Sequence, residues 1–313
     1  MSCMEVVTVF GGSGFLGRYV VRQLASQGLF IRVIVRNPNE ALFLRVYGKV
    51  GQIQLIGGDI KEELKIQEYV KGSSCVINCV ATFFETRSQS FNVLHVSAAK
   101  NLAKVAKKEG VSQFIHISSL GASTESTSQL QRSKGAGEEA VLECFPNANI
   151  VRPSLIFGIE DTFFNRFAKL SSISPFIPVV GPETKFQPVY VDDVAKVISM
   201  LVETGQKKKY LELGGDETYT FRELIKLLLA EIKRKRLILK IPFSIARVMA
   251  ATNDFFRLIL GDVVPAFLTL AQVKSLEKDN VVGRDSDKFS DFKIAPKKLK
   301  IVLPTIVSRF NKS

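Results

Sequence analysis

Residues 5–17 read EVVTVFGGSGFLG, and this stretch decides the fold of the chain. The β-branched run Glu5–Phe10 ends at glycines and predicts a buried strand. Residues 15–27 follow with helical spacing and stop before Gly28, a residue type common at helix C-termini. Residues 30–35 predict a second strand. Strand, glycine loop, helix and strand form a βαβ unit, which requires a parallel sheet and a right-handed crossover.

Strands and helices keep alternating as far as Arg152. Further strands are predicted at residues 52–56, 75–80, 113–117 and 149–151. Helices are predicted between them at residues 61–70, 90–109 and 133–144. Six strands with intervening helices are typical of an α/β fold with a Rossmann-type, doubly wound parallel sheet.

Beyond Arg152, prolines interrupt the pattern and helical spacing dominates. Helices are predicted at residues 161–171, 193–203, 221–233, 242–260 and 299–310. We interpret residues 1–152 as a dinucleotide-binding Rossmann domain and residues 153–313 as a smaller, mostly helical C-terminal lobe. Residues 186–214 are expected to return to the Rossmann sheet.

Charge and composition limit the classes of partner. The chain has 43 Lys and Arg against 30 Asp and Glu, a net charge of +13. This charge favours an anionic partner: a phosphorylated cofactor, nucleic acid, an anionic membrane or an acidic protein face. Nucleic acid is disfavoured, because the chain has no Trp and its basic clusters are not interleaved with aromatic residues. With two histidines and no Cys-x-x-Cys pair, no metal site is expected.

The start of the chain and its cysteines bear on its location. A strand pattern begins at Glu5, so we expect no signal peptide. The sequence also lacks the run of roughly 18 uncharged apolar residues that a transmembrane helix needs. Four cysteines without a pairing pattern are typical of a reducing, intracellular compartment. We therefore expect a cytoplasmic protein.

The glycine loop fits two spacings, Gly11-x-x-Gly14-x-x-Gly17 and Gly12-x-Gly14-x-x-Gly17. Glycine allows a tight turn and a close approach of the backbone to a ligand, and the following helix directs its free N–H groups at a pyrophosphate. The loop follows a strand and opens a helix inside a βαβ unit, which is the context that a dinucleotide site requires. The sequence therefore predicts a dinucleotide site here.

The residues after the next two strands indicate which dinucleotide binds. An acidic residue usually stands about 20 residues beyond the loop and binds the adenosine ribose hydroxyls. Here Arg36 occupies that place, and Arg18 lies beside the loop. A guanidinium pairs with a 2′-phosphate, so we predict NADP(H) in preference to NAD(H). The alternative is that Arg36 is a solvated surface residue. Asp59 is placed to accept a hydrogen bond from adenine, to cap a helix from Lys61, or to do both.

These features together resemble the short-chain dehydrogenase/reductase superfamily, in its extended or atypical branch, which includes proteins labelled NAD-dependent epimerase/dehydratase. The sequence is more similar to one subgroup, the nucleotide-binding accessory subunit of respiratory complex I and its alphaproteobacterial relatives. The similarity covers most of the chain and weakens after about Lys240. The segments that carry it are the glycine loop and residues 58–59, 76–81, 117–122, 133–138, 145–148, 152–158, 160–165 and 187–191.

The resemblance implies a set of cofactor-binding positions at the carboxyl ends of the strands. They are Gly11, Ser13, Gly14, Phe15, Leu16, Gly17, Arg18, Arg36, Asp59, Ile60, Val80, Ala81, Lys134 and Pro153. The bound cofactor would be a nicotinamide nucleotide.

The resemblance also implies a catalytic centre that is incomplete in this chain. Active members use a Tyr-x-x-x-Lys pair on one face of a helix, with a serine that orients the substrate. Lys134 matches the lysine and Ser119 (or Ser118) the serine, but Leu130 stands where the tyrosine should be. Leucine has no proton to exchange, and general acid–base catalysis typically supplies about 10²–10⁴ in rate.

Two functions therefore stay open. One is a catalytically weak or inactive accessory or assembly factor, linked to respiratory complex I or quinone metabolism, in which NADP(H) stabilises the fold. The other is an active reductase or epimerase that acts on a lipid, a quinone precursor or a sugar nucleotide.

Basic and apolar residues cluster in the C-terminal lobe. Residues 233–236 read KRKR, and residues 242–260 combine large apolar side chains with two arginines. This composition suits an amphipathic helix on an anionic membrane or against a protein partner, and the alternative is packing on its own lobe. With the resemblance, it predicts a bacterial protein bound peripherally to the inner face of the membrane. We interpret Asp192 and Asp193 as a helix N-cap rather than as a metal site.

Overall fold

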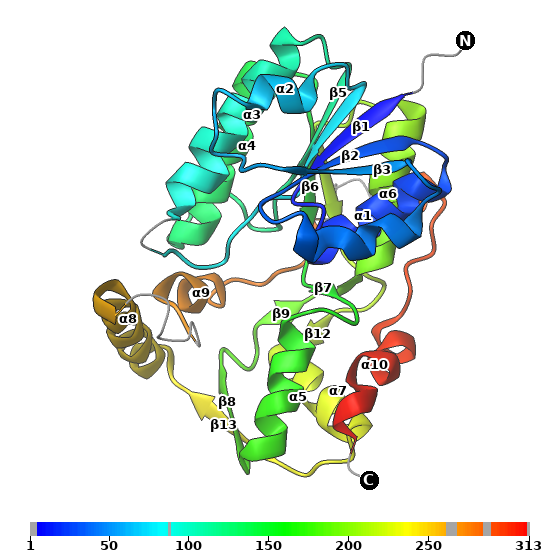
Figure 1. The fold of residues 1–313 in the computed structure, drawn as a ribbon. Helices are drawn as coiled ribbons and strands as arrows, with labels where there is room; N and C mark the ends of the chain where they lie inside the picture. Colours follow the sequence, from blue (N-terminus) through cyan, green and yellow to red (C-terminus); the bar gives the residue numbers. More distant parts are fainter. Residues whose placement is uncertain (1–4, 87–88, 261–267, 284–288, 312–313) are drawn as a thin grey trace.

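The computed structural model describes residues 5–86, 89–260, 268–283 and 289–311 of the chain (Figure 1). Its centre is a parallel seven-stranded sheet in the order β11-β6-β5-β4-β1-β2-β3. The α/β prediction is confirmed, and all six predicted strands are present. The strands are β1 (Val6–Phe10), β2 (Phe30–Val35), β3 (Ile53–Gly57), β4 (Cys75–Asn78), β5 (Gln113–Ile117), β6 (Asn149–Pro153) and β11 (Tyr210–Leu213).

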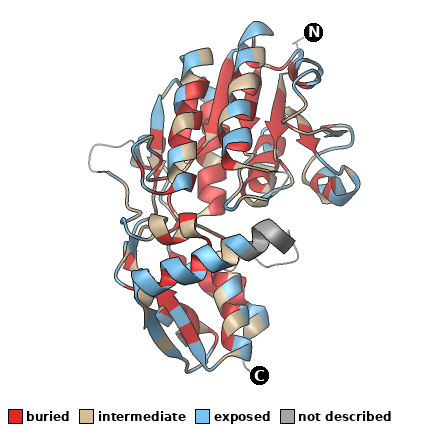
Figure 2. Cartoon of the chain, turned by 90° about the vertical axis from the view of Figure 1, so that its left-hand side faces the viewer, coloured by how far each residue is buried: buried red, intermediate tan, exposed pale blue. Residues whose placement is uncertain are grey.

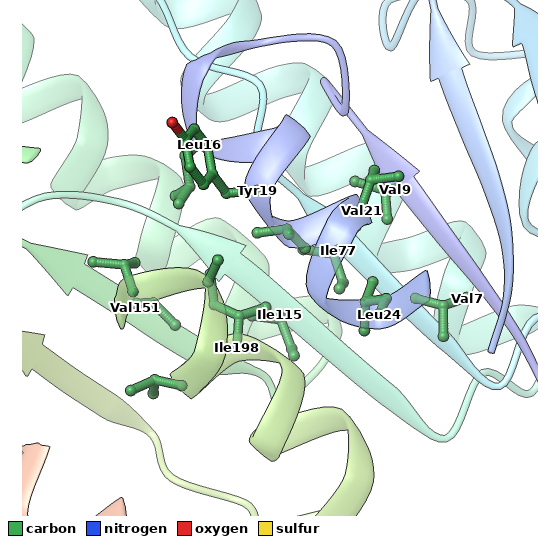
Figure 3. Packing of buried hydrophobic residues seen from close by; sticks show 14 of the residues in the cluster. Val7, Val9, Leu16, Tyr19, Val21, Leu24, Ile77, Ile115, Val151 and Ile198 are labelled. Atoms are coloured by element: carbon green, nitrogen blue, oxygen red, sulfur yellow. The ribbon is translucent and has the colours of Figure 1, made fainter. Parts of the chain in front are cut away.

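Helices cover both faces of the sheet and bury a separate apolar core on each side. One face carries α1 (Phe15–Ser26) and α6 (Val191–Thr204), and the other carries α2 (Ile66–Val70), α3 (Ala99–Lys108) and α4 (Gln129–Cys144). Figure 3 shows how the first core forms, with Val21 and Leu24 of α1 and Ile198 of α6 packed on strand residues such as Val9 and Ile77. These fully buried contacts hold α1 against β1 and β4.

Several boundaries in the Rossmann domain differ from the prediction. The helix expected at residues 61–70 begins only at Ile66, because Asp59 Oδ1 accepts from the Lys61 amide at 2.9 Å and keeps the chain in turns. The helix expected at residues 90–109 starts as a π-helical segment, η2 (Asn92–Ala98), before α3. The 3₁₀ segment η1 (Asn39–Tyr47) was not predicted.

The rest of the chain forms a smaller lobe at the carboxyl edge of the sheet (Figure 1). Its main core lies between α5 (Phe163–Ile173), α7 (Phe221–Glu231) and α10 (Leu299–Val307). The chain enters this lobe after β6, returns to the sheet through α6 and β11, and then enters the lobe again at β12. Strand β11 pairs with β6. The division of the chain at residues 152 and 153 stays a prediction.

The lobe contains short strands that helical spacing did not predict. The largest pair is parallel, β8 (Phe176–Val180) with β13 (Leu237–Ile241). The other elements of the lobe are β7 (Ile156–Phe157), β9 (Lys185–Phe186), β10 (Val189–Tyr190), β12 (Tyr219–Thr220), α8 (Phe243–Leu260), α9 (Leu270–Ser275) and η5 (Ser308–Phe310). The segment η4 (Phe289–Phe292) packs instead against α6, in the first core of the sheet.

Candidate nucleotide-binding site

The glycine loop forms a tight turn that leaves the start of α1 open. Gly11 has a φ of +75°, a conformation that favours glycine, and its carbonyl accepts from the Gly14 amide at 3.0 Å. Helix α1 begins after Gly14 with no side-chain cap and no acidic residue in its first turn. Its first N–H groups are therefore free, and the positive end of the helix dipole faces an exposed glycine. This arrangement suits a phosphate group.

Most of the predicted cofactor residues lie around this loop, at the carboxyl ends of β1 to β4, whereas Lys134 lies on α4 and Pro153 is the last residue of β6. A Cβ atom on Gly11 would lie 3.1 Å from the Val80 amide nitrogen, so the segment after β4 borders the loop. Arg36 follows β2, and Asp59 follows β3. The side chains of Leu16 and Ile60 are buried in the two cores, so these two residues can contact a ligand only through their backbone.

The two arginines beside the loop differ in their surroundings. Arg36 is exposed and makes no hydrogen bond or ion pair with any residue that the structure describes. Arg18 is engaged: it pairs with Glu160 at 3.3 Å and lies over the Phe43 ring at 4.8 Å. Arg36 is therefore free to bind a phosphate, whereas Arg18 has a competing carboxylate.

Lys134 lies on α4 and is only 5% exposed. Its ammonium donates to the Ser118 carbonyl at 3.3 Å and lies 5.4 Å from the Phe83 ring. Burial lowers its pKa from 10.5 to about 8. Next to it, the buried Ser118 Oγ has no hydrogen-bond partner among the described residues, whereas Ser119 Oγ donates to Gln131 at 3.1 Å. A buried ammonium with unused N–H groups beside an unpartnered hydroxyl fits the hydroxyls of a nucleotide ribose.

Leu130 is 5% exposed and forms a small apolar cluster with Phe91 and Ala271. Ala271 belongs to α9, which is fixed to the start of α4 because Ser128 Oγ donates to the Ala271 carbonyl at 2.8 Å. A cavity of about 530 Å³ lies beside this cluster, between α4, α8 and α9. The position expected to hold the tyrosine is thus a packed apolar contact between the sheet domain and the C-terminal lobe.

Comparison with known proteins agrees with this geometry. A family described as NAD(P)H-binding matches residues 11–148. Subunit 9 of the mitochondrial NADH dehydrogenase [ubiquinone] 1 alpha subcomplex of Arabidopsis thaliana is 37% identical over 302 residues, which are 94% of this chain and 75% of that protein. The Dictyostelium discoideum protein of the same name is 37% identical over 90% of this chain and 76% of its own length. This chain belongs to the subunit 9 family of that complex.

Other similarities place this family member within a wider group. A ceramide reductase of Caulobacter vibrioides is 33% identical over 190 residues, 61% of this chain and 58% of that enzyme. The solved structure of the Citrobacter triphenylmethane reductase with NADP(H) superimposes with a TM-score of 0.72 at 18% identity, over 96% of this chain and 99% of that one. The prediction of an atypical short-chain dehydrogenase/reductase is confirmed, and a nicotinamide nucleotide is the supported ligand.

Both histidines of this family member are buried and neutral. The Thr82 amide donates to His95 Nε2 at 3.2 Å, so His95 Nδ1 carries the proton toward Ser133 Oγ at 2.8 Å. Burial, and secondarily Lys134, lowers the His95 pKa to about 3. His116 lies 3.2 Å from the Asn78 amide, and burial lowers its pKa to about 4. Neither histidine supplies an acidic proton near neutral pH.

The aspartate pair after β10 does not cap α6 as predicted. The N-cap is Tyr190, and Asp192 and Asp193 lie in the first turn of the helix. Asp192 accepts from Arg22 at 2.8 Å, and Asp193 accepts from the Lys297 amide at 2.6 Å. Both carboxylates thus tie neighbouring segments to α6. Within the described ranges, no group of three His, Cys, Asp or Glu could hold a metal ion.

Replacing Lys134 by methionine is expected to stabilise the nucleotide-free protein and to weaken nucleotide binding. The pKa of Lys134 is lower in the folded state than its ordinary 10.5, so its charge destabilises the fold below pH 8. That cost disappears as the pH rises from about 8 to 10.5. At pH 7 the variant should gain at most about 3 kcal/mol in free energy of unfolding.

Urea unfolding of the wild type and the variant between pH 7 and pH 10.5 measures this difference. The gain should shrink over that interval, and Lys104→Met on the exposed face of α3 should show no such trend. A gain that is independent of pH would contradict the role assigned to the buried ammonium.

Proposed function

We propose that this protein is an accessory or assembly subunit associated with respiratory complex I, in which NADP(H) is a structural ligand. The observation that carries the proposal is the buried cluster of Leu130, Phe91 and Ala271 at the position of the missing proton donor. The phosphate loop is intact, Lys134 is retained, and an apolar contact replaces the acid. A nucleotide present at about 100 times its dissociation constant adds about 2.7 kcal/mol to stability.

The phosphorylated nucleotide is favoured by the charge around the ribose end of the site. Arg36 follows β2, is exposed and has no ion-pair partner in the part of the chain that the structure describes. An acidic residue at this place would bind unphosphorylated ribose hydroxyls. A guanidinium binds a 2′-phosphate through two parallel hydrogen bonds. Isothermal titration with both nucleotides tests the preference, and NADH binding at least tenfold tighter than NADPH would contradict it.

A second candidate function is an active NAD(P)-dependent reductase, and the cavity beside Leu130 favours it. Its walls include the apolar residues Phe84, Phe91 and Leu270 together with Arg132 and Lys274, which suits an amphiphilic substrate. The similarity to a ceramide reductase points in the same direction. Such an enzyme would use Ser119, Lys134 and an acid other than a tyrosine at position 130.

The substitutions Leu130→Tyr and Leu130→Phe distinguish the two functions. The wild type and both variants are expected to leave NADPH unconsumed with a short-chain quinone and with a 3-keto-sphingoid base. The two variants differ by one hydroxyl, so a rate that appears only with tyrosine would mean that acid–base chemistry alone was missing. Absorbance at 340 nm follows the nucleotide, and turnover by the wild type would contradict the accessory role in favour of the reductase.

Helix α8 supports peripheral attachment to an anionic membrane. Its small residues Ala246 and Ala250 face inward and are fully buried. Its large residues Ile245, Val248 and Met249 are 52%, 66% and 53% exposed. Figure 2 shows this helix, which ends in grey, lying across the surface of the molecule with mostly exposed residues. A helix that turns its large apolar side chains outward presents them to a partner.

The positive charge near α8 favours an anionic lipid surface as that partner, which we place on the inner face of a bacterial membrane. Residues 232–253, which include β13 and the first half of α8, contain six Lys and Arg and no Asp or Glu. Cations in the same stretch of chain as exposed apolar residues match anionic headgroups above acyl chains. No helix in the described part of the chain is long and apolar enough to cross a membrane.

Flotation with vesicles tests this attachment. The wild type is expected to float with vesicles that contain phosphatidylglycerol and cardiolipin, and less with pure phosphatidylcholine. The double variant Val248→Glu/Met249→Glu should stay unbound, because it places two charges on the apolar face. Val46→Glu, at a site 79% exposed on η1, is the matched control and should float normally. Absence of binding at every salt concentration would refute the lipid surface and leave a protein partner for α8.

A further inference from the structure

The turn at residues 158–161, between β7 and α5, is fixed against the start of α1. Asp161 accepts from the Gly158 amide at 3.2 Å and from the Phe164 amide at 2.7 Å. A Cβ atom on Gly158 would lie 2.7 Å from Val191 and 3.1 Å from the Phe15 ring, so the turn packs directly against α6 and α1. The C-terminal lobe thereby presents Glu160 to the phosphate-binding end of α1.

The Glu160 carboxylate has two partners on α1. Its Oε1 pairs with the Arg18 guanidinium at 3.3 Å, and its Oε2 accepts from the Tyr19 hydroxyl at 2.8 Å. The Glu160 side chain is 35% exposed and that of Arg18 is 25% exposed. The pair is thus partly shielded and lies at the rim of the site.

Arg18 folds over the glycine loop. Its guanidinium donates to the carbonyls of Ser13 and Gly14 at 3.2 and 3.3 Å. It also lies over the ring of Phe43, which belongs to the segment that follows β2 and Arg36. The guanidinium therefore stands between the phosphate loop and the segment expected to contact the ribose phosphate.

We propose that Glu160 is a specificity-determining residue of the nucleotide site. Its carboxylate competes with the 2′-phosphate of NADP(H) for the Arg18 guanidinium, and so limits the preference for the phosphorylated nucleotide. The inference rests on the proposed binding of NADP(H). A phosphate monoester carries up to twice the charge of a carboxylate, so it can displace Glu160 when it binds. Arg36 has no carboxylate partner among the described residues, so its binding to the 2′-phosphate would not be weakened in this way.

The experiment is isothermal titration of NADPH, NADH and 2′,5′-ADP into the wild type, Glu160→Gln, Arg18→Met and the double variant. Glu160→Gln is expected to tighten NADPH and 2′,5′-ADP about two- to fivefold more than NADH, the range that a partly exposed ion pair supports. In the Arg18→Met background, the same substitution should leave the ratio of the two affinities unchanged. Glu203→Gln removes a carboxylate that contacts Gln27, at the opposite end of α1 from the phosphate loop, and should shift both nucleotides alike.

Two results would overturn the inference. One is an equal gain for NADPH and NADH in Glu160→Gln, or no gain at all. The other is a gain in the NADPH preference that persists without Arg18. Thermal unfolding of each variant, together with Tyr19→Phe, separates loss of the interlobe contact from the effect on binding. If the wild type binds none of the three compounds, the proposed function fails first; if it binds them and the variants do not respond, only the role of Glu160 fails.

Discussion

Replacing Gly17 by alanine is expected to abolish detectable nucleotide binding and to lower the stability of the nucleotide-free protein. A Cβ atom at this position would lie 2.7 Å from Gly12 Cα and 2.9 Å from the Gly11 carbonyl carbon, and closer still to the Gly11 oxygen. All three are backbone atoms, so no side chain can move aside to relieve the clash. Overpacking of this kind costs roughly 1–3 kcal/mol, more than the gain in helix propensity of about 1 kcal/mol.

Gly14→Ala is the matched control for this prediction. Its Cβ atom would meet only the Gly11 oxygen, at 3.2 Å, and its φ of −70° suits alanine. The control should unfold close to the wild-type temperature but bind nucleotide more weakly, because its methyl group occupies the approach to the loop. Urea unfolding measures stability and titration with NADPH measures binding. Wild-type stability and binding in Gly17→Ala would contradict the role of the loop.

Replacing Arg152 by methionine is expected to lower the free energy of unfolding by about 3–5 kcal/mol. Arg152 on β6 donates from Nε to both carboxylate oxygens of Glu138, whose side chain on α4 is only 2% exposed. Its Nη1 also lies 3.6 Å from Glu212 on β11. The substitution removes the guanidinium that pairs directly with the buried Glu138 carboxylate and releases α4, which carries Lys134, from β6.

The double variant Glu138→Leu/Arg152→Met provides the control. Removal of both charges should restore much of the lost stability, because no unpaired carboxylate stays buried. Urea unfolding of the two single variants and the double variant measures the coupling energy. Additive losses in the double variant would show that the pair contributes little beyond its individual contacts.

The sequence alone was sufficient for the Rossmann domain because its signals are local. Strand runs, the glycine loop and helical spacing between residues 5 and 152 predict the six strands and the helices between them from neighbouring residues, although η1 was not predicted. The pair β8 and β13 is different, because its two strands lie about 60 residues apart and β8 contains Pro178. Proline at that position indicated a loop, and only tertiary pairing makes it a strand.

The predicted cofactor residues also show that sequence signals are informative only over short distances along the chain. Their positions at the ends of the strands followed from the βαβ order, and the structure gathers them at one edge. Their roles at the site stay predictions. Contacts that cross between the two lobes gave no signal in the sequence. Glu160 beside Arg18 and Ala271 beside Leu130 each join residues more than 100 positions apart, so periodicity could not reveal them.

The central claim is that the nucleotide acts as part of the structure of this protein. Scanning calorimetry of the nucleotide-free protein with increasing NADPH tests it most directly. We expect the unfolding temperature to rise by several degrees as NADPH passes about 100 times its dissociation constant, and the nucleotide to be recovered unoxidised. An unfolding temperature that does not change with millimolar NADPH would contradict the account.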